Sequence, residues 1–127
     1  MMYKITPTLA TIDIDVADSE PLYNDLQIKD WFLIDVRDMA DDGTNKLTVY
    51  EKRIDEAVEL LDLHCNVVIG CDAGISRSNS IALGVLVKHF KMDFYDAWEL
   101  VRQKVPRCNI DPSHIRRLKK LFSVGPP

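Results

Sequence analysis

The sequence lacks the features that mark several large classes of protein. It has no apolar run of about eighteen residues, so we expect no helix that spans a membrane. The segment from Met1 to Pro7 contains no apolar signal core, which favours a protein that stays in the cytoplasm. Basic residues are not in excess: 16 Lys and Arg stand against 20 Asp and Glu, a net charge of −4. Nonspecific binding to nucleic acid or to anionic membranes is therefore disfavoured.

Cysteine and histidine are also scarce. The three cysteines, Cys65, Cys71 and Cys108, form an odd number without the spacing of a disulfide framework, which is typical of reduced thiols. No Cys/His pairing of the zinc type occurs, and the three histidines are scattered along the chain. We therefore expect no bound metal.

What is present indicates an ordinary globular protein. The chain has 127 residues, of which 46% are hydrophobic and 28% charged. This length suits one domain over residues 1–127, large enough to bury a core without disulfides. The oligomeric state is not indicated by any pattern.

Strand-like and helix-like patterns alternate along the chain. Strand patterns occur at 2–5, 8–16, 31–36 and 66–70, and helical patterns at 21–26, 47–62, 81–90, 94–104 and 112–123. Such alternation predicts an α/β domain in which helices pack on a central, mostly parallel sheet.

The loop between the strand at 66–70 and the helix at 81–90 carries the chemistry. It begins with Cys71, and Arg77 follows after five residues. In such a loop the backbone N–H groups form a nest for an anion, and the helix N-terminus adds positive potential. Gly74 permits the sharp turn that this wrapping requires. The planar guanidinium of Arg77 fits two phosphate oxygens at once.

A cysteine at the bottom of this cradle is expected to be a nucleophile. A free thiol has a pKa of about 8.5, and helix N-termini and neighbouring cations lower it to roughly 3.5–7.5. Cys71 is then largely thiolate and ready to attack the phosphorus atom that the loop binds. The Ser78 hydroxyl, next to Arg77, is placed to stabilise the sulfur when it leaves.

The segment Cys71-Asp-Ala-Gly-Ile-Ser-Arg77-Ser78 resembles the signature loop of the dual-specificity branch of the cysteine-dependent protein phosphatases. The similarity covers about residues 31–123, because Met92-Asp93, the segment 101–104 and the segment 110–112 follow that family's order. The resemblance implies a protein-tyrosine-phosphatase-like fold and hydrolysis through a cysteinyl-phosphate, without metal or other cofactor. It implies catalytic roles for Cys71, Arg77 and Ser78, and a substrate-binding loop made of Asp72, Ala73, Gly74, Ile75, Ser76 and Arg77.

The same resemblance implies an aspartate that acts as acid and then as base. The family carries it on a loop after the strand that precedes the long helix. Asp38 is favoured when positions are counted forward from the strand, whereas Asp41 or Asp42 is favoured when they are counted back from Leu47. Asp35 is a further competitor. We take Asp38 as the expected acid and keep Asp41 and Asp42 as alternatives.

Three features depart from the family pattern. Gly70 precedes the cysteine where the family usually has a histidine that tunes the thiol, so Cys71 is expected to be less acidic than is typical. Ser113 stands where an asparagine commonly helps to hold the loop. The short segment before Cys71 indicates that one strand–helix element is trimmed and the pocket rim is open.

Two other interpretations compete for parts of the sequence. His64-Cys65 imitates a His-Cys motif, but no arginine follows at the required spacing, so we expect Cys65 to be a small buried residue. The alternative is that Cys65 forms a protective disulfide with oxidised Cys71. The segment 33–37 resembles the opening motif of rhodanese domains, although the two helical patterns after residue 92 argue against that fold.

The loop also indicates the substrate. Residues 72–76 include the acidic Asp72 and no lysine, whereas relatives that act on inositol lipids or RNA 5′ ends usually carry extra basic residues there. We therefore expect a phosphorylated protein as partner, with phosphotyrosine and also phosphoserine or phosphothreonine accepted. The alternatives are a phosphate-loop module that binds phosphoproteins with little turnover, and a phosphatase of RNA 5′ ends or phosphoinositides.

Overall fold

A four-stranded sheet forms the centre of the computed structural model, which describes residues 2–14, 31–73 and 75–127. The strands stand in the order β1-β2-β4-β3, and their bounds are Met2–Lys4 for β1, Leu9–Asp13 for β2, Trp31–Asp35 for β3 and Asn66–Cys71 for β4. Strand β1 is antiparallel to β2, whereas β4 is parallel to both of its neighbours. The mostly parallel sheet predicted from the sequence is confirmed. The helix predicted at 21–26, the end of the strand predicted at 8–16, and Gly74 lie outside the described residues.

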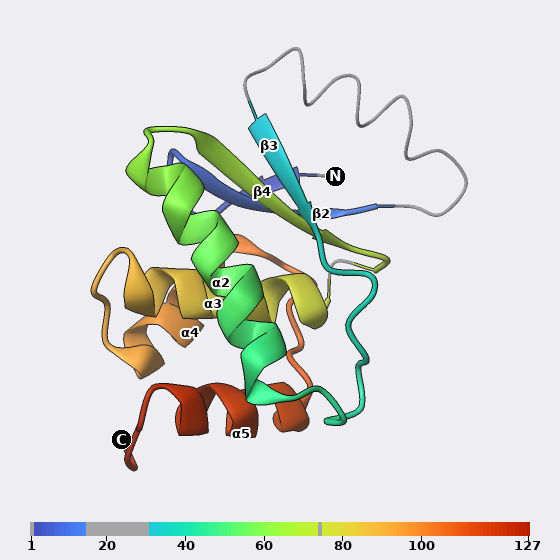
Figure 1. Ribbon diagram of the computed structural model, residues 1–127, viewed down its shortest axis with the longest axis vertical. Coiled ribbons are helices and arrows are strands. Elements are labelled where there is room, and N and C mark those ends of the chain that lie inside the picture. Colours follow the sequence, from blue (N-terminus) through green and yellow to red (C-terminus); the bar gives the residue numbers. More distant parts are fainter. Residues whose placement is uncertain (1, 15–30, 74) are drawn as a thin grey trace.

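The four helices of the described residues gather on one side of this sheet (Figure 1). Their bounds are Leu47–Asp62 for α2, Arg77–Lys88 for α3, Phe94–Lys104 for α4 and Pro112–Leu121 for α5. Helix α3 contacts the sheet and each of the other three helices, and α5 packs on α2 and α3. None of the helices in the described ranges is long and apolar enough to cross a membrane.

Capping residues fix where the last two helices begin. The carboxylate of Asp93 accepts hydrogen bonds from two backbone N–H groups in the first turn of α4. Asp111 accepts one from the Ser113 N–H, and Pro112 occupies the first turn of α5. Both starts agree with the sequence prediction. Helix α3 begins at Arg77, four residues earlier than its apolar pattern predicted, because Ser80 Oγ and Asn79 Nδ2 donate to carbonyl groups in the loop and first turn.

The two faces of β4 bury different side chains. Val67, Ile69 and Cys71 belong to the core shared with the helices, whereas Val68 packs on the other face of the sheet. Gly70 points to that other face, where a Cβ atom would lie 2.5 Å from Ile14 Cδ1. The histidine that the family usually carries at this position has no room unless Ile14 moves.

Candidate active site

Strand β4 brings Cys71 to the carboxyl edge of the sheet, between its two parallel neighbours. The backbone N–H of Ile14 donates to the Cys71 carbonyl (2.9 Å), and that of Val36 donates to the Gly70 carbonyl (2.8 Å). The segments that follow β2 and β3 therefore bind the end of β4 from both sides. In open parallel sheets this edge is where ligands bind.

The loop after Cys71 is anchored at its far end. The Ile75 carbonyl accepts two hydrogen bonds of 2.9 Å, one from Asn79 Nδ2 and one from the backbone N–H of Asn109. The first comes from inside α3 and the second from the segment before α5. Since Asn79 is fully buried, the loop is tied to the interior of the molecule rather than held by its own residues alone.

The thiol of Cys71 is almost completely shielded, with 2% of the residue exposed. It donates a hydrogen bond to Ser78 Oγ at 3.2 Å, and Ser78 is itself fully buried in the first turn of α3. The serine predicted beside the sulfur therefore lies in contact with it.

A cavity of about 330 Å³ opens above this loop. It is lined by Asp41, Cys71, Ala73, Ile75, Ser76, Arg77, Asn109, Asp111 and Pro112. Most of the residues predicted from the sequence for the loop share this cavity, whereas Asp38, Asp72 and Ser78 do not line it. The sequence did not assign Asn109, Asp111 or Pro112 to the site, although Asp111 and Pro112 belong to the segment 110–112 that follows the family's order.

The guanidinium of Arg77 connects three segments. Its Nη1 donates to the carbonyls of Arg37 and Met39, both at 2.9 Å. Its Nη2 forms an ion pair of 3.2 Å with Asp72. The arginine therefore holds the loop after β3 against the loop after β4, and it lies close to the carboxylate of Asp72.

The aspartates after β3 face different surroundings. Asp38 is 64% exposed and forms an ion pair of 2.6 Å with Arg53. Asp42 is bound by the backbone and hydroxyl of Thr44, and these hydrogen bonds lower its pKa. Burial raises the pKa of Asp35, but the hydrogen bonds and charge of Arg37 outweigh this, so that its pKa lies below the ordinary value. Among these four aspartates, Asp41 alone lines the cavity.

Asp41 is held through a single carboxylate oxygen. Its Oδ1 accepts a hydrogen bond from Ser76 Oγ at 2.9 Å and contacts His114 Nε2 at 2.5 Å. His114 is fully buried in the first turn of α5. No sequence signal could have identified this histidine, because it lies 73 positions from its partner and belongs to no local motif.

The chain is similar to a known protein family over most of its length. The model described as "Dual specificity phosphatase, catalytic domain" matches residues 6–123. The chain belongs to the dual specificity phosphatase family. A curated relative, human dual specificity protein phosphatase 9, is 34% identical over 62 residues, which cover 46% of this chain and 16% of that protein. This match confirms the family that the loop predicted. The rhodanese-type alternative is therefore rejected.

Solved structures of dual specificity and related phosphatases share the fold. Human DUSP28 superposes with a TM-score of 0.80 at 14% identity, covering 96% of this chain and 93% of that one. The human tyrosine phosphatase-like serine/threonine/tyrosine-interacting protein gives 0.77 at 18% identity, with coverages of 96% and 95%. The protein-tyrosine-phosphatase-like fold predicted from the sequence is confirmed.

The remaining thiols of this dual specificity phosphatase domain, Cys65 and Cys108, do not line the cavity. Cys65 immediately precedes β4 and Cys71 ends it, so the extended chain advances six steps from one to the other, roughly 20 Å at about 3.3 Å per residue. Since a disulfide requires Cα atoms within about 7 Å, the Cys65–Cys71 pairing is excluded. Cys65 is partly exposed rather than buried as expected. Burial raises the pKa of Cys108 to about 11, which leaves it a poor nucleophile.

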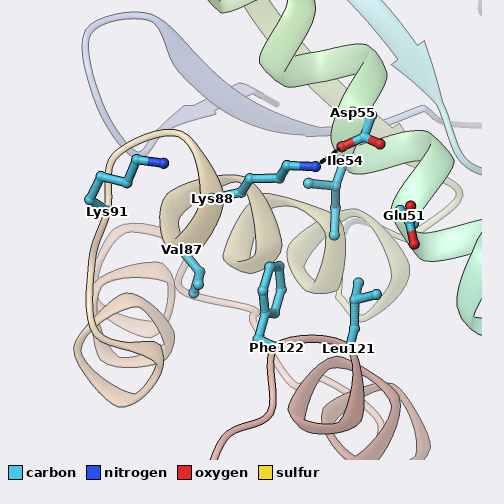
Figure 2. Close-up of a pocket in the computed structure, with 8 residues that line it drawn as sticks. All are labelled: Glu51, Ile54, Asp55, Val87, Lys88, Lys91, Leu121 and Phe122. Carbon is cyan, nitrogen blue, oxygen red and sulfur yellow. Dashed lines mark hydrogen bonds and ion pairs between the residues drawn. The ribbon is translucent and has the colours of Figure 1, made fainter.

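A second hollow of this phosphatase domain lies between α2, α3 and the end of α5, with a volume of about 370 Å³ (Figure 2). Ile54, Val87, Leu121 and Phe122 form its apolar wall, and Lys88 pairs with Asp55 across its rim. Its lining contains neither a cysteine nor an arginine. It therefore lacks the cysteine and arginine that line the cavity at Cys71.

Proposed function

We propose that this domain hydrolyses phosphate monoesters on proteins, phosphotyrosine first and phosphoserine or phosphothreonine as well, through a cysteinyl-phosphate on Cys71. The observation that carries the proposal is that Cys71, Arg77 and Asp41 line one cavity above the N-terminus of α3. These side chains supply a nucleophile, a cation for the phosphoryl oxygens and a proton donor. We assign the acid/base role to Asp41 in place of Asp38, whose carboxylate is engaged by Arg53 outside the cavity.

In the first step the Cys71 thiolate attacks phosphorus. The S–P bond forms, the P–O bond to the substrate breaks, and the leaving oxygen takes the proton of the Asp41 carboxyl group. The backbone N–H groups of the loop and the Arg77 guanidinium stabilise the negative charge on the equatorial oxygens. The products are a free hydroxyl and the cysteinyl-phosphate.

In the second step water replaces sulfur. The Asp41 carboxylate takes a proton from the water as its oxygen bonds to phosphorus, and the S–P bond breaks to release phosphate and the thiolate. Ser78 Oγ lies 3.2 Å from Sγ. When the sulfur leaves as an anion, the Ser78 hydroxyl donates to it and lowers the cost of its charge.

The charge near the cavity supports a phosphoprotein rather than a highly charged substrate. Two aspartates besides the proposed acid lie at or next to the site: Asp111 lines the cavity, and Asp72 binds Arg77. A triphosphate or a polyphosphorylated inositol ring would place several negative charges near these carboxylates. A single phosphate on a tyrosine, serine or threonine brings fewer charges and meets less of that repulsion, and tyrosine should be the fastest of these because phenolate is the easiest leaving group.

The proposal is tested by phosphate release from p-nitrophenyl phosphate, with a reductant and without added metal. Cys71→Ser should reduce turnover to background, while Cys108→Ser, as the matched cysteine control, should leave it unchanged. With a phosphotyrosine peptide, Asp41→Asn should lower kcat by about 10²–10⁴-fold, the usual contribution of general acid–base catalysis. Asp38→Asn should change it little.

Three results would redirect the assignment. Stoichiometric capture of a phosphotyrosine peptide without phosphate release would indicate a binding module. Release from phosphoinositides or RNA 5′ ends, but not from phosphopeptides, would indicate another substrate class. A large loss in Asp38→Asn, with Asp41→Asn near wild type, would return the acid role to Asp38.

A further inference from the structure

A line of buried hydrogen bonds runs from the interior of the molecule to the cavity. Tyr50, in α2, contacts His114 Nδ1 through its hydroxyl at 2.6 Å. His114, in α5, contacts Asp41 Oδ1 through Nε2 at 2.5 Å. Tyr50 and His114 are both fully buried, whereas the Asp41 side chain is 48% exposed. The line therefore starts in the core and ends on the carboxyl group that faces the cavity.

We propose that His114 is a positioning residue for Asp41, and that it fixes which carboxyl oxygen exchanges the proton with the substrate. The inference rests on the proposed function and goes beyond it, because it gives a role in the reaction to a residue that does not line the cavity. His114 binds Oδ1 and so leaves Oδ2 to carry and transfer the proton.

The hydrogen-bond partners determine the tautomer of His114. A neutral imidazole has one donor nitrogen and one acceptor nitrogen. Because the Asp41 Oδ1 atom accepts, Nε2 carries the hydrogen, and Nδ1 must then accept from the Tyr50 hydroxyl. Burial raises the pKa of Tyr50, so its hydroxyl keeps the proton that this arrangement needs.

A second donor holds the same oxygen from the other side. Ser76 Oγ donates to Asp41 Oδ1 at 2.9 Å, and it accepts from the backbone N–H of Asp111 at 2.9 Å. The N–H bond fixes the direction of the serine hydroxyl, so its hydrogen points to Asp41. Oδ1 is thus committed to His114 and Ser76, one from α5 and one from the Cys71 loop.

Other charged groups lie near this line of hydrogen bonds but are not part of it. Asp111 caps α5 one turn before His114. Arg117 lies one turn after His114 and donates a hydrogen bond to the Gly43 carbonyl, in the loop that carries Asp41. Arg117 and Asp111 act on Tyr50 only through charge. The direct contacts to the Asp41 carboxyl group are those of His114 and Ser76.

Two substitutions of the same histidine separate positioning from packing. In His114→Gln the side-chain amide nitrogen reaches the place of Nε2 and retains the donor to Asp41. In His114→Asn it reaches the place of Nδ1, so the donor to Asp41 is lost. Both variants are polar and can bond Tyr50 or Asp41, but only one preserves the bond that the proposal requires.

The test compares two leaving groups. Phosphotyrosine needs a proton on its departing oxygen, whereas p-nitrophenolate leaves without one. We expect His114→Asn to lower kcat/KM for a phosphotyrosine peptide by roughly 10–100-fold and for p-nitrophenyl phosphate by less than about threefold, since kcat/KM reports the first step and only phosphotyrosine needs the acid there. His114→Gln should restore the phosphotyrosine rate to within about threefold of wild type.

A double variant shows whether the effect passes through Asp41. If it does, Asp41→Asn with His114→Asn should be no slower than Asp41→Asn alone, because the interaction is already lost. Tyr50→Phe keeps the ring and should show the same substrate pattern with a smaller loss. This variant keeps the inference testable where a His114 variant does not fold.

The outcomes that overturn the inference differ from those that overturn the proposed function. Equal losses on both substrates in the Asn and Gln variants would assign His114 to packing alone. Wild-type rates on both substrates in His114→Asn would show that Asp41 needs no such support. Absence of turnover in the folded wild-type protein, with no difference from Cys71→Ser, would remove the proposed function and with it the inference.

Discussion

At the scale of single residues, the guanidinium of Arg77 is already engaged by groups of the protein itself. Its Nη1 binds two carbonyls of the loop after β3, and its Nη2 binds Asp72. A phosphate that enters the cavity must compete with the Asp72 carboxylate for Nη2. The exposed carboxylate therefore weakens the binding of any anion at this position.

Asp72→Asn is expected to strengthen phosphate binding. The Asp72 side chain is 46% exposed, and an ion pair of this kind contributes about 0.2–1 kcal/mol. Removing the charge should lower the inhibition constant of inorganic phosphate by up to about fivefold, measured against p-nitrophenyl phosphate hydrolysis. Asp96→Asn, an exposed aspartate in α4, is the matched control. A weaker inhibition in Asp72→Asn would show that this carboxylate helps to shape the loop instead.

The residues of the site differ in how far the sequence could predict them. Cys71, Arg77 and Ser78 lie within eight positions, so a strand, a loop and a helix start bring them together without long-range information. The aspartate could not be chosen, because the path of the loop after β3 depends on the bonds that Arg77 makes to it. Their catalytic roles stay predictions until turnover is measured.

At the scale of elements, the start of α5 carries a carboxylate that titrates. Asp111 accepts a hydrogen bond from the Ser113 N–H, and its bonds with Ser113 lower its pKa below the ordinary 3.8. A group whose pKa is lower in the folded protein stabilises the fold above its unfolded pKa. This stabilisation is lost as the pH falls through the folded pKa.

Asp111→Asn should therefore make the stability of the protein depend less steeply on pH under acidic conditions. Asparagine caps a helix as well as aspartate does but does not titrate. Melting temperatures should fall less steeply for Asp111→Asn than for wild type below pH 3.8, where the wild-type carboxylate becomes protonated. Parallel profiles for the two proteins would contradict a contribution from Asp111.

The contact between α2 and α3 depends on Gly84. A Cβ atom at this position would lie 2.3 Å from Ile54 Cδ1 and 2.9 Å from Ile54 Cγ1. Gly84→Ala should lower the free energy of unfolding by about 1–3 kcal/mol, because the added methyl group overpacks this contact. Better helix propensity should offset up to about 1 kcal/mol of this loss.

Ile54→Val removes the closest atom and provides the matched test. The single change should cost about 0.5–1.5 kcal/mol. In denaturant titrations the double variant should be more stable than the sum of the two single losses predicts, because the collision is relieved. Strict additivity would show that α3 shifts as a whole to accept the methyl group.

The sequence predicted the ends of a helix correctly where the local chemistry determines them. Helices α2 and α4 occupy the predicted ranges 47–62 and 94–104, because apolar periodicity is regular in both and Asp93 caps the second. Helix α3 was predicted to start late, because its first turn is polar yet buried. Polar residues that are satisfied by loop carbonyls look like loop residues in a sequence.

At the scale of the whole molecule, the cavity joins the end of β4, the loop after β3, the start of α3 and the segment before α5. These segments come from distant parts of the chain. An anion that binds all of them stabilises the folded state and has no comparable site in the unfolded chain.

Inorganic phosphate should therefore raise the melting temperature. At about 100 times its dissociation constant, the expected gain in the free energy of unfolding is about 2.7 kcal/mol. The shift should persist in Cys71→Ser, which keeps the loop, and shrink in Arg77→Lys, which loses the planar fork. An equal shift in Arg77→Lys would place the bound phosphate elsewhere.

Because His114 of α5 binds Asp41, a protein engineer who transplants this site would have to move residues from several parts of the chain. A graft of residues 71–78 onto another parallel sheet would carry the sulfur and the guanidinium but neither the Asp41 carboxyl group nor the histidine that binds it. The smallest portable unit also includes the loop after β3, Tyr50 and the first turn of α5. Recombination between homologues that separates residue 41 from residue 114 should accordingly yield chimaeras that hold phosphate but turn it over slowly.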